Sequence, residues 1–386
     1  MILAIKDLTV RYKATRYSIA HIKDSVAMAE LSRHFLQMEK ESVHITFINR
    51  KFKEKVELLL RKELEKFKKT GIMSIYALNG VNLDVDEGKV VAVIGESGSG
   101  KSTLALAILR ILPENAETSG DIIFGGESLF KLDEEKMRLK RAKEFGYIGQ
   151  GSYTYLNPLM EGAFQIFESS LVAAKDLDEA SRLFIDAIKT VKLDSRTLLS
   201  YPEKLSGGEV RRVAIAIALA KNPRLLICDE PFKGIDPYMA MQLVSTLREL
   251  KEKLKVTMLI LTHDLPLMVE IADEIAVIYH GIIVEKGPLD KVFSKPVHPY
   301  TKGLIGALPD IRNPEKKLVY VPGEPLPRTI RYDFCPFANR CPRSDENCLE
   351  MLPKLKKVDD RQVACVKADE FLELSPIEFW GPYLDL

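Results

Sequence analysis

The stretch Gly95-Glu-Ser-Gly-Ser-Gly-Lys101-Ser102 decides how this chain folds. It directly follows an apolar run, Val90–Ile94, and precedes a segment of helical character, Thr103–Ile111. The spacing G-x-x-x-x-G-K-[ST] is typical of loops whose backbone N–H groups surround a polyphosphate at the N-terminus of a helix. We therefore predict a strand, a phosphate-binding loop and a helix in that order. The alternative, a plain surface loop, does not explain the flanking strand and helix.

The loop residues have predicted tasks in binding a nucleotide and its metal ion. Lys101 would reach the β and γ phosphates, and the Ser102 hydroxyl would bind Mg²⁺. The other candidates for nucleotide contact are Gly95, Ser97, Gly98, Ser99, Gly100 and Thr103. The predicted ligands are thus ATP and Mg²⁺.

Two adjacent carboxylates end a second apolar run, Leu225–Cys228. Asp229 would hold Mg²⁺ through water, and Glu230 is placed to polarise an attacking water. Such a pair at the end of a buried strand is costly unless a cation or hydrogen bonds offset its charge. We predict a metal-dependent hydrolytic site here; the alternative is a strand that simply exits to solvent. Cys228 is expected to be a small buried apolar residue.

Composition excludes several other classes of protein. The 386 residues exceed what one compact domain usually needs, and 46% are hydrophobic, enough for a core. The 56 basic and 55 acidic side chains give a formal charge of +1, which argues against a generally basic nucleic-acid binder. No apolar run approaches the roughly 18 to 20 residues that span a bilayer, and the N-terminus does not resemble a secretory signal. We expect a soluble, intracellular chain.

From Tyr76 to about Gly287, short apolar runs alternate with helical segments. These runs are rich in Val, Ile and Leu, as in strands buried on both faces of a mainly parallel sheet. They are Val90–Ile94, Leu225–Cys228, Thr257–Leu261 and Ile275–Tyr279. Residues 2–12 alternate and predict an edge strand, whereas residues 151–205 predict a helical subdomain. The predicted fold class is α/β.

Leu205-Ser206-Gly207-Gly208-Glu209 lies between the phosphate loop and the acidic pair, and it resembles the signature motif of ABC ATPases. The other motifs of that family occur along the chain in the expected order, some before and some after this stretch. Their candidate residues are Gln150 of the Q-loop, Asp236 of the D-loop, the switch residue His263, and Tyr12, which would stack on adenine. Tyr76 competes with Tyr12 for that last role because an insert separates Tyr12 from the phosphate loop.

The resemblance implies a P-loop NTPase fold of the ABC type, with an antiparallel edge β-subdomain. It also implies that Gln150 binds Mg²⁺ and that Glu230, His263, Gln150 and Lys101 are catalytic. Ser206, Gly207 and Gly208 would donate to the nucleotide of a second subunit, since a helix N-terminus suits a γ-phosphate. Hydrolysis would then depend on closure of the dimer.

Two later stretches, Gly281–Gly287 and Pro296-Val-His-Pro-Tyr-Thr301, narrow the resemblance to the ATP-binding subunits of oligopeptide/dipeptide/nickel importers. This implies an ABC ATPase domain at 1–287 and an extension at 288–386, whose frequent prolines predict an extended linker. The expected partners are a paralogous ATP-binding subunit in a heterodimer, two transmembrane permeases and, indirectly, an external solute-binding protein, with no nucleic acid. The chain would be peripheral, at the cytoplasmic face of the cell membrane.

Four of the five cysteines lie close together near the C-terminus: Cys335, Cys341, Cys348 and Cys365. Their spacing lacks the short knuckle of most structural zinc sites and suits a [4Fe–4S] cluster, which some members of the resembled family carry. Zinc, disulfides and free thiols are the alternatives. We expect a structural cluster that stabilises a small unit with little core of its own.

Residues 13–75 depart from the family pattern, with 14 Lys and Arg against 8 Asp and Glu. Apolar residues between Ile48 and Phe67 recur at helical spacing, and Gly71 would end that helix. A shorter helix over about 26–38 would complete a hairpin packed on the edge of the sheet. Contact with the membrane surface or another subunit is the alternative.

The predicted function is ATP hydrolysis in a membrane importer for di- or oligopeptides, or for a related solute such as an oligosaccharide. The alternative is a non-transport ABC ATPase that acts on nucleic acid or ribosomes.

Overall fold

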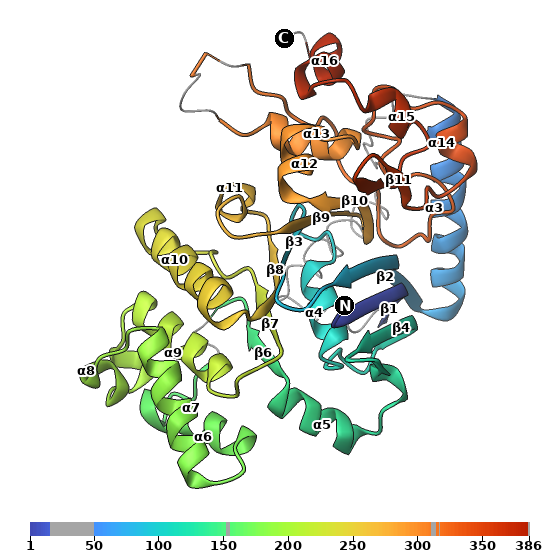
Figure 1. Cartoon of the computed structure of the whole chain (residues 1–386). Helices are drawn as coiled ribbons and strands as arrows, with labels where there is room; N and C mark the ends of the chain where they lie inside the picture. Colours follow the sequence, from blue (N-terminus) through green and yellow to red (C-terminus); the bar gives the residue numbers. More distant parts are fainter. Residues whose placement is uncertain (16–49, 152–154, 310–313, 316, 385–386) are drawn as a thin grey trace.

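The computed structural model describes residues 1–15, 50–151, 155–309, 314–315 and 317–384; the helix predicted over about 26–38 lies outside them. Two β-sheets with surrounding helices make up the described chain (Figure 1). The strands are β1 (Leu3–Thr15), β2 (Ile72–Val85), β3 (Val90–Ile94), β4 (Ala116–Phe124), β5 (Glu127–Ser128), β6 (Phe145–Ile148), β7 (Leu225–Asp229), β8 (Thr257–Thr262), β9 (Glu274–Tyr279), β10 (Ile282–Pro288), β11 (Lys356–Val358) and β12 (Arg361–Val363). The helices are α3 (Arg50–Thr70), α4 (Lys101–Ile108), α5 (Glu134–Lys143), α6 (Gly162–Ala173), α7 (Leu177–Thr190), α8 (Ser195–Leu198), α9 (Gly207–Leu219), α10 (Pro237–Leu254), α11 (Leu265–Met268), α12 (Leu289–Ser294), α13 (Pro299–Gly306), α14 (Asn347–Glu350), α15 (Ala368–Phe371) and α16 (Pro376–Trp380).

The larger sheet has the strand order β11-β12-β10-β9-β3-β8-β7-β6. Its five strands from β9 to β6 pair in parallel, and β10 to β11 continue the sheet in antiparallel pairing. Every residue of β3, β7 and β8 is buried, because both faces of these strands are covered. The predicted α/β class with a mainly parallel sheet is confirmed.

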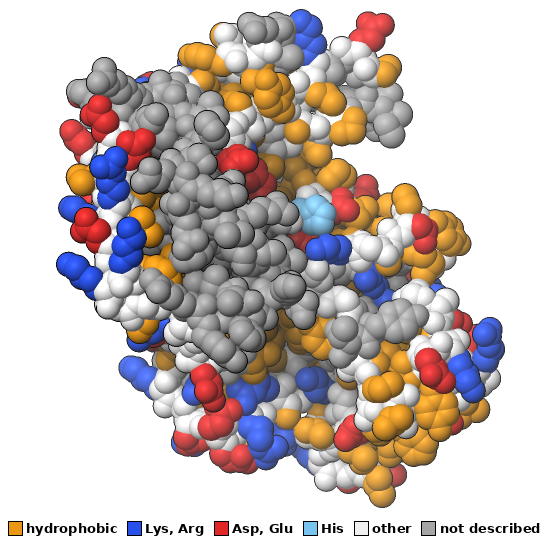
Figure 2. Space-filling view, turned by 180° about the vertical axis from the view of Figure 1, so that it is seen from behind, with side chains coloured by type: hydrophobic (Ala, Val, Ile, Leu, Met, Phe, Trp, Pro, Cys, Tyr) orange, Lys and Arg blue, Asp and Glu red, His pale blue; other side chains and the backbone are white. Residues whose placement is uncertain are grey.

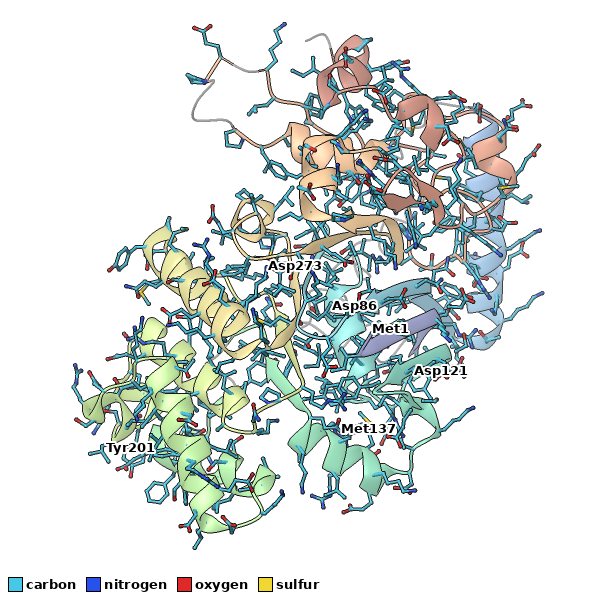
Figure 3. The ribbon with its side chains drawn as sticks, in the orientation of Figure 1. Met1, Asp86, Asp121, Met137, Tyr201 and Asp273 are labelled. Atoms are coloured by element: carbon cyan, nitrogen blue, oxygen red, sulfur yellow. The ribbon has the colours of Figure 1, made fainter. Side chains whose placement is uncertain are left out.

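The smaller sheet has the order β2-β1-β4-β5 and is antiparallel. The strand predicted over residues 2–12 is β1, but the expectation that it lies at an edge is wrong, since β1 pairs with both β2 and β4. The N-terminal amine of Met1 forms an ion pair of 2.9 Å with Asp86, just after β2 (Figure 3). This sheet is the edge β-subdomain expected of an ABC-type fold.

Alternate residues of β3 face two different hydrophobic cores. Val91 and Val93 pack with α4 and the smaller sheet, whereas Val90, Ala92 and Ile94 pack in a core that also contains residues of α9 and α10. The second core extends to Tyr300 and Trp380 of the C-terminal region, and Trp380 Nε1 donates to the carbonyl of Pro299 at 3.2 Å. The C-terminal region therefore shares the core of the nucleotide-binding sheet.

The region after β6 is helical, as predicted. Helices α6 and α7 pack through an edge-on contact between Phe167 and Phe184, whose ring centroids are 5.7 Å apart. Helix α9 begins at Gly207, and the preceding N-cap residue, Ser206, forms a capping box with Glu209. This region projects from the β6 end of the sheet (Figure 1).

The expectation of an extended linker after Lys286 is wrong for the residues up to Gly306, whereas the described residues between Gly306 and Asn347 form no helix or strand. Strand β10 continues to Pro288, and helices α12 and α13 follow. The prolines start helices here: Pro299 occupies the first turn of α13, where its missing N–H costs nothing. Strands β11 and β12 then join the larger sheet, so this part of the chain packs on the sheet.

Helix α3 confirms the amphipathic helix predicted in the insert, and it ends at Thr70, just before Gly71 at φ +68°. Its packing differs from the expectation of a hairpin on the edge of the sheet. Phe67 contacts β1 and β2, but Val56 and Leu60 pack on the cysteine-bearing region, near Phe334. Sequence periodicity shows which face of a helix is apolar but not which surface covers it.

Among the helices of the described residues, none combines the length and the apolar character that crossing a membrane requires.

The buried His298 predicts a specific loss of stability in acid. Burial lowers its pKa to about 3 from 6.5, and its Nδ1 accepts the N–H of Tyr300 at 3.1 Å as the N-cap of α13. The neutral ring is favoured in the folded state, so its stabilisation is complete above about pH 6.5. It falls by about 1.4 kcal/mol for each pH unit below that value.

Urea unfolding at pH 7.5 and pH 5.5 should therefore show a loss of about 1.4 kcal/mol more in the wild type than in His298→Asn. Asn also caps helices but does not titrate in this range. Equal pH dependence of the two proteins would contradict the assignment.

Candidate active site and cysteine site

The phosphate loop joins β3 to α4, as the motif predicts. Gly98 and Gly100 have φ of +78° and +110°, a region in which residues with a Cβ are strained. A Cβ on Gly100 would also lie 2.6 Å from the carbonyl oxygen of Ala77. Gly100 is therefore required both by its backbone angles and by the closeness of β2.

Lys101 lies almost fully buried at the start of α4. Its Nζ donates to the carbonyl oxygens of Gly95 at 2.7 Å and Glu96 at 3.1 Å, and lies 3.3 Å from Oε1 of Glu230. Burial lowers the pKa of Lys101, and the carboxylate of Glu230 opposes that shift. The amine is thus held between the loop and β7, where a phosphate bound in the loop could compete for it.

The Ser102 hydroxyl donates to Oδ1 of Asp229 at 3.1 Å. Asp229 is 3% exposed, and burial raises its pKa, with the hydrogen bond from Ser102 acting against that shift. A cation beside these oxygens would stabilise the ionised carboxylate, which burial alone disfavours. The donor set therefore fits Mg²⁺, which takes one or two protein oxygens together with phosphates and water.

Glu230 and His263 meet where β7 and β8 end. Nδ1 of His263 lies 2.8 Å from Oε2 of Glu230, and the Glu230 N–H donates to the Leu261 carbonyl at 2.7 Å. Glu230 has φ +49°, a left-handed conformation that is rare for a residue with a long side chain. The two predicted catalytic groups thus lie in direct contact.

Gln150 follows β6, the strand next to β7, and its side chain is exposed. Because parallel strands end at the same edge, Gln150 lies on the Asp229 side of the sheet. Tyr12 donates to Thr103 Oγ1 at 3.3 Å and so contacts the first turn of α4. Tyr76 lies opposite Arg11 in the pairing of β1 with β2, and its N–H donates to the carbonyl of Arg328 at 2.9 Å. This geometry favours Tyr12 over Tyr76 as the aromatic residue beside a nucleotide.

The signature residues occupy the exposed N-terminus of α9. Ser206 hydrogen-bonds with Glu209 of its own helix, and Gly207 is exposed. Gly208 lies against Met239 of α10, where a Cβ would come within 2.0 Å of the Met239 methyl carbon. Asp236 caps α10, accepting the Met239 N–H at 3.0 Å. These residues lie at the N-termini of α9 and α10, and not on the loop, β7 or β8.

Sequence reasoning missed a contact between the phosphate loop and the C-terminal region. The Glu96 N–H donates to the Tyr300 hydroxyl at 3.0 Å, and Nη1 of Arg340 lies 3.3 Å from both carboxylate oxygens of Glu96. Arg340 is 244 residues away in the chain, and no local pattern signals such a pair. Only the fold brings them together.

The four C-terminal cysteines line one cavity, together with side chains that include Arg343 and Lys367. All four are free thiols in the structure, so the disulfide alternative is not supported. Burial raises the pKa of each, that of Cys365 to about 12, and the neighbouring cysteines raise the pKa of Cys335 further. The fifth cysteine, Cys228, is fully buried in β7, as expected.

Three of these cysteines share one local geometry. The N–H of the residue two positions later bonds to the sulfur and lowers its pKa, against the larger effect of burial. The pairs are Cys335 with Phe337, Cys341 with Arg343, and Cys365 with Lys367. The effect of these N–H groups on the pKa favours the thiolate, the form that ligates metals, but burial outweighs it at each of the three sulfurs.

Comparison with known proteins gives matches along most of the chain. The ABC transporter family model matches residues 78–233, and the model of the oligopeptide/dipeptide transporter C-terminal region matches residues 284–348. A dipeptide transport ATP-binding protein of Caldanaerobacter subterraneus subsp. tengcongensis is 36% identical over 76% of this chain and 91% of that protein. An oligopeptide transport ATP-binding protein of Bacillus subtilis is 36% identical over 74% of this chain and 82% of that protein.

Solved structures agree with the fold. The dimeric bacterial ABC transporter cassette MJ0796 is 28% identical and aligns with 56% of this chain and 92% of its own, with a TM-score of 0.50. CbiO1 of Clostridium perfringens, part of the transporter complex cbiONQ, is 27% identical and aligns with 57% of this chain and 84% of its own, at a TM-score of 0.51. The similarity covers little more than half of this chain.

Glu230→Gln should reduce steady-state ATP hydrolysis at least about 100-fold while ATP still binds, because Gln keeps the shape of the side chain but cannot accept a proton from water. Phosphate release and equilibrium binding of a fluorescent ATP analogue measure the two properties. Glu249→Gln, which alters a partly exposed carboxylate paired with Lys192, is the matched control. Normal turnover of Glu230→Gln would contradict its role as the base.

Proposed function

Because the chain belongs to the ABC transporter family of ATP-binding subunits with an oligopeptide/dipeptide transporter C-terminal region, we propose that it powers import of di- or oligopeptides through a membrane complex. Its activity is ATP hydrolysis coupled to transport. The observation that carries the peptide assignment is the C-terminal match at residues 284–348, alongside relatives named for dipeptides and oligopeptides. A related solute such as an oligosaccharide is the alternative cargo within this function.

We propose that the domain boundary lies near Gly287, with the ATPase domain at 1–287 and the extension at 288–386. Within the ATPase domain, 13–75 is an insert and 151–205 a helical subdomain. Strand β10 crosses the boundary and β12 pairs with it, so the extension is packed on the sheet.

Within the chain, each polar group at the loop has a task in hydrolysis. The loop N–H groups and Lys101 would bind the β and γ phosphates. Ser102, Asp229 and Gln150 would hold Mg²⁺, which neutralises phosphate charge when bound. Glu230 would accept a proton from the attacking water, and His263, 2.8 Å from Glu230 Oε2, would orient that carboxylate and contact the γ-phosphate.

A second ATP-binding subunit is needed to complete this site. Ser206, Gly207 and Gly208 form an exposed helix N-terminus on α9, not on the loop and α4 that carry Lys101, and such a terminus binds anions. We propose that it contacts the nucleotide of a paralogous subunit in a heterodimer, which agrees with the dimeric cassette among the similar structures.

Two permease subunits are the other proposed partners, with an external solute-binding protein acting through them. The helical region carries large exposed apolar side chains, among them Leu159 at 84%, Leu177 at 66% and Phe164 at 63%. Figure 2 shows hydrophobic side chains gathered over this end of the molecule. Exposed apolar surface of this extent marks an interaction site, and contact with the permeases would place the chain at the cytoplasmic face of the membrane.

We further propose that the four C-terminal cysteines ligate a [4Fe–4S] cluster. Among the described residues, no three His, Cys, Asp or Glu side chains are arranged around a single metal ion. This finding supports neither a zinc ion nor a cluster at these cysteines. Support comes from the common cavity, the N–H groups aimed at the sulfurs and the nearby Arg343 and Lys367, which suit an anionic cluster.

The function is tested by reconstituting the chain in vesicles with its paralogous ATPase, its permeases and its solute-binding protein. A dipeptide or short oligopeptide should stimulate ATP hydrolysis severalfold and accumulate inside, and neither should occur with Glu230→Gln. Stimulation by RNA or ribosomes instead would favour the non-transport ATPase, and response to an oligosaccharide alone would change the cargo.

The cluster is tested by anaerobic purification of the wild type, Cys341→Ser and Cys228→Ser. The wild type and Cys228→Ser, which alters the buried cysteine outside the cavity, should contain about four irons and absorb near about 400 nm. Cys341→Ser should lose most of both. One zinc per chain without that absorption would support the zinc alternative, and a metal-free wild type would contradict any cluster.

A further inference from the structure

We propose that Arg340 is a positioning residue for ATP binding: it neutralises Glu96 of the phosphate loop and so links the cysteine-bearing region to nucleotide affinity. Glu96 belongs to the loop that must hold a highly charged triphosphate. A carboxylate there without a counter-charge would repel the phosphates, because like charges in a partly buried site interact strongly. Arg340 supplies the counter-charge from the far end of the chain.

Arg340 is held rigidly for this purpose. Its Nε donates to the carbonyl of Pro322 at 3.0 Å and its Nη2 to that of Val321 at 3.2 Å. These bonds leave Nη1 directed at Glu96, 3.3 Å from both carboxylate oxygens. The rings of Tyr279 and Phe337 lie 5.8 and 5.9 Å from the guanidinium, which is 5% exposed. A guanidinium with this many partners has little freedom to leave.

The same turn carries two of the cysteines. Ala338 donates its N–H to the carbonyl of Cys335 at 3.1 Å, and both Arg340 and Cys341 donate theirs to that of Phe337 at 3.0 Å. Any change in the folding of this turn therefore moves Arg340 relative to Glu96. The Tyr300 hydroxyl, which accepts the Glu96 N–H at 3.0 Å, adds a second link between the loop and the C-terminal region.

The structure offers a matched control for this pair. Arg361 lies in the same C-terminal region, is 2% exposed, and sits 3.8 Å from the buried Glu285, but its partners lie on β10 and around α12, away from the loop. Arg361→Gln should lower thermal stability and leave ATP affinity unchanged. This variant thus separates the loss of stability that follows from removing a buried arginine from a specific effect on ATP binding by the loop.

Equilibrium binding of a fluorescent ATP analogue to the full chain measures the effect. Arg340→Gln should raise Kd about tenfold, which corresponds to about 1.4 kcal/mol, and should raise KM more than it lowers kcat. Adding Glu96→Gln should restore Kd to within about threefold of the wild type, because the carboxylate that repels phosphate is gone. Circular dichroism and thermal melting confirm that each variant is folded.

An unchanged Kd in folded Arg340→Gln, or a double variant that binds no better than Arg340→Gln, would overturn the proposal. If Arg340→Gln does not fold, the Kd of the single variant Glu96→Gln tests the proposal. This variant should bind ATP at least as tightly as the wild type. A tenfold loss in that variant would mean that the pair only maintains the shape of the loop. None of these outcomes depends on the solute carried.

Discussion

The burial of charge where the parallel strands end is the constraint on which the rest of the structure depends. Lys101, Asp229 and Glu230 are at most 7% exposed, and the isolated charges would be costly there. Glu230 neutralises the charge of Lys101, whose Nζ also donates a hydrogen bond to a loop carbonyl. Asp229 accepts a hydrogen bond from the Ser102 hydroxyl. These contacts require the end of β3, the start of α4 and the end of β7 to lie at the same edge of the sheet, where β8 separates the two strands. A nucleotide and its cation would replace contacts that the chain now makes with itself.

The C-terminal region is part of this arrangement and not an appendage to it. Tyr300 and Trp380 lie in the same core as β3, and β12 extends the sheet from β10. A region with too little core of its own gains stability by sharing one. It also reaches the active site, since Tyr300 and Arg340 both contact Glu96. Folding of the C-terminal region and the shape of the phosphate loop are therefore coupled.

The parts that local patterns encode were predictable from the sequence. The apolar run Val90–Ile94 followed by the phosphate motif predicts β3, the loop and α4, because the strand, the glycines and the helix are each specified within a few residues. The contacts of α3 were not predictable, since its apolar face fits several surfaces equally well. The helices after Lys286 were missed because Pro299 favours both a turn and the first turn of a helix.

The unpredicted contacts have a common physical origin. The fold of the sheet, and not a local sequence pattern, brings Arg340 to Glu96. The same is true of α3 and the region around Phe334. Lys55 of α3 illustrates this: its Nζ donates to the Leu349 carbonyl at 2.6 Å and lies over the Phe334 ring, although the insert precedes the phosphate loop in sequence. The cysteine-bearing region is thus held on one side by the insert and on another by the loop. Since coupling free energies are reciprocal, a ligand that orders the loop must also stabilise the turn that carries Cys335 and Cys341.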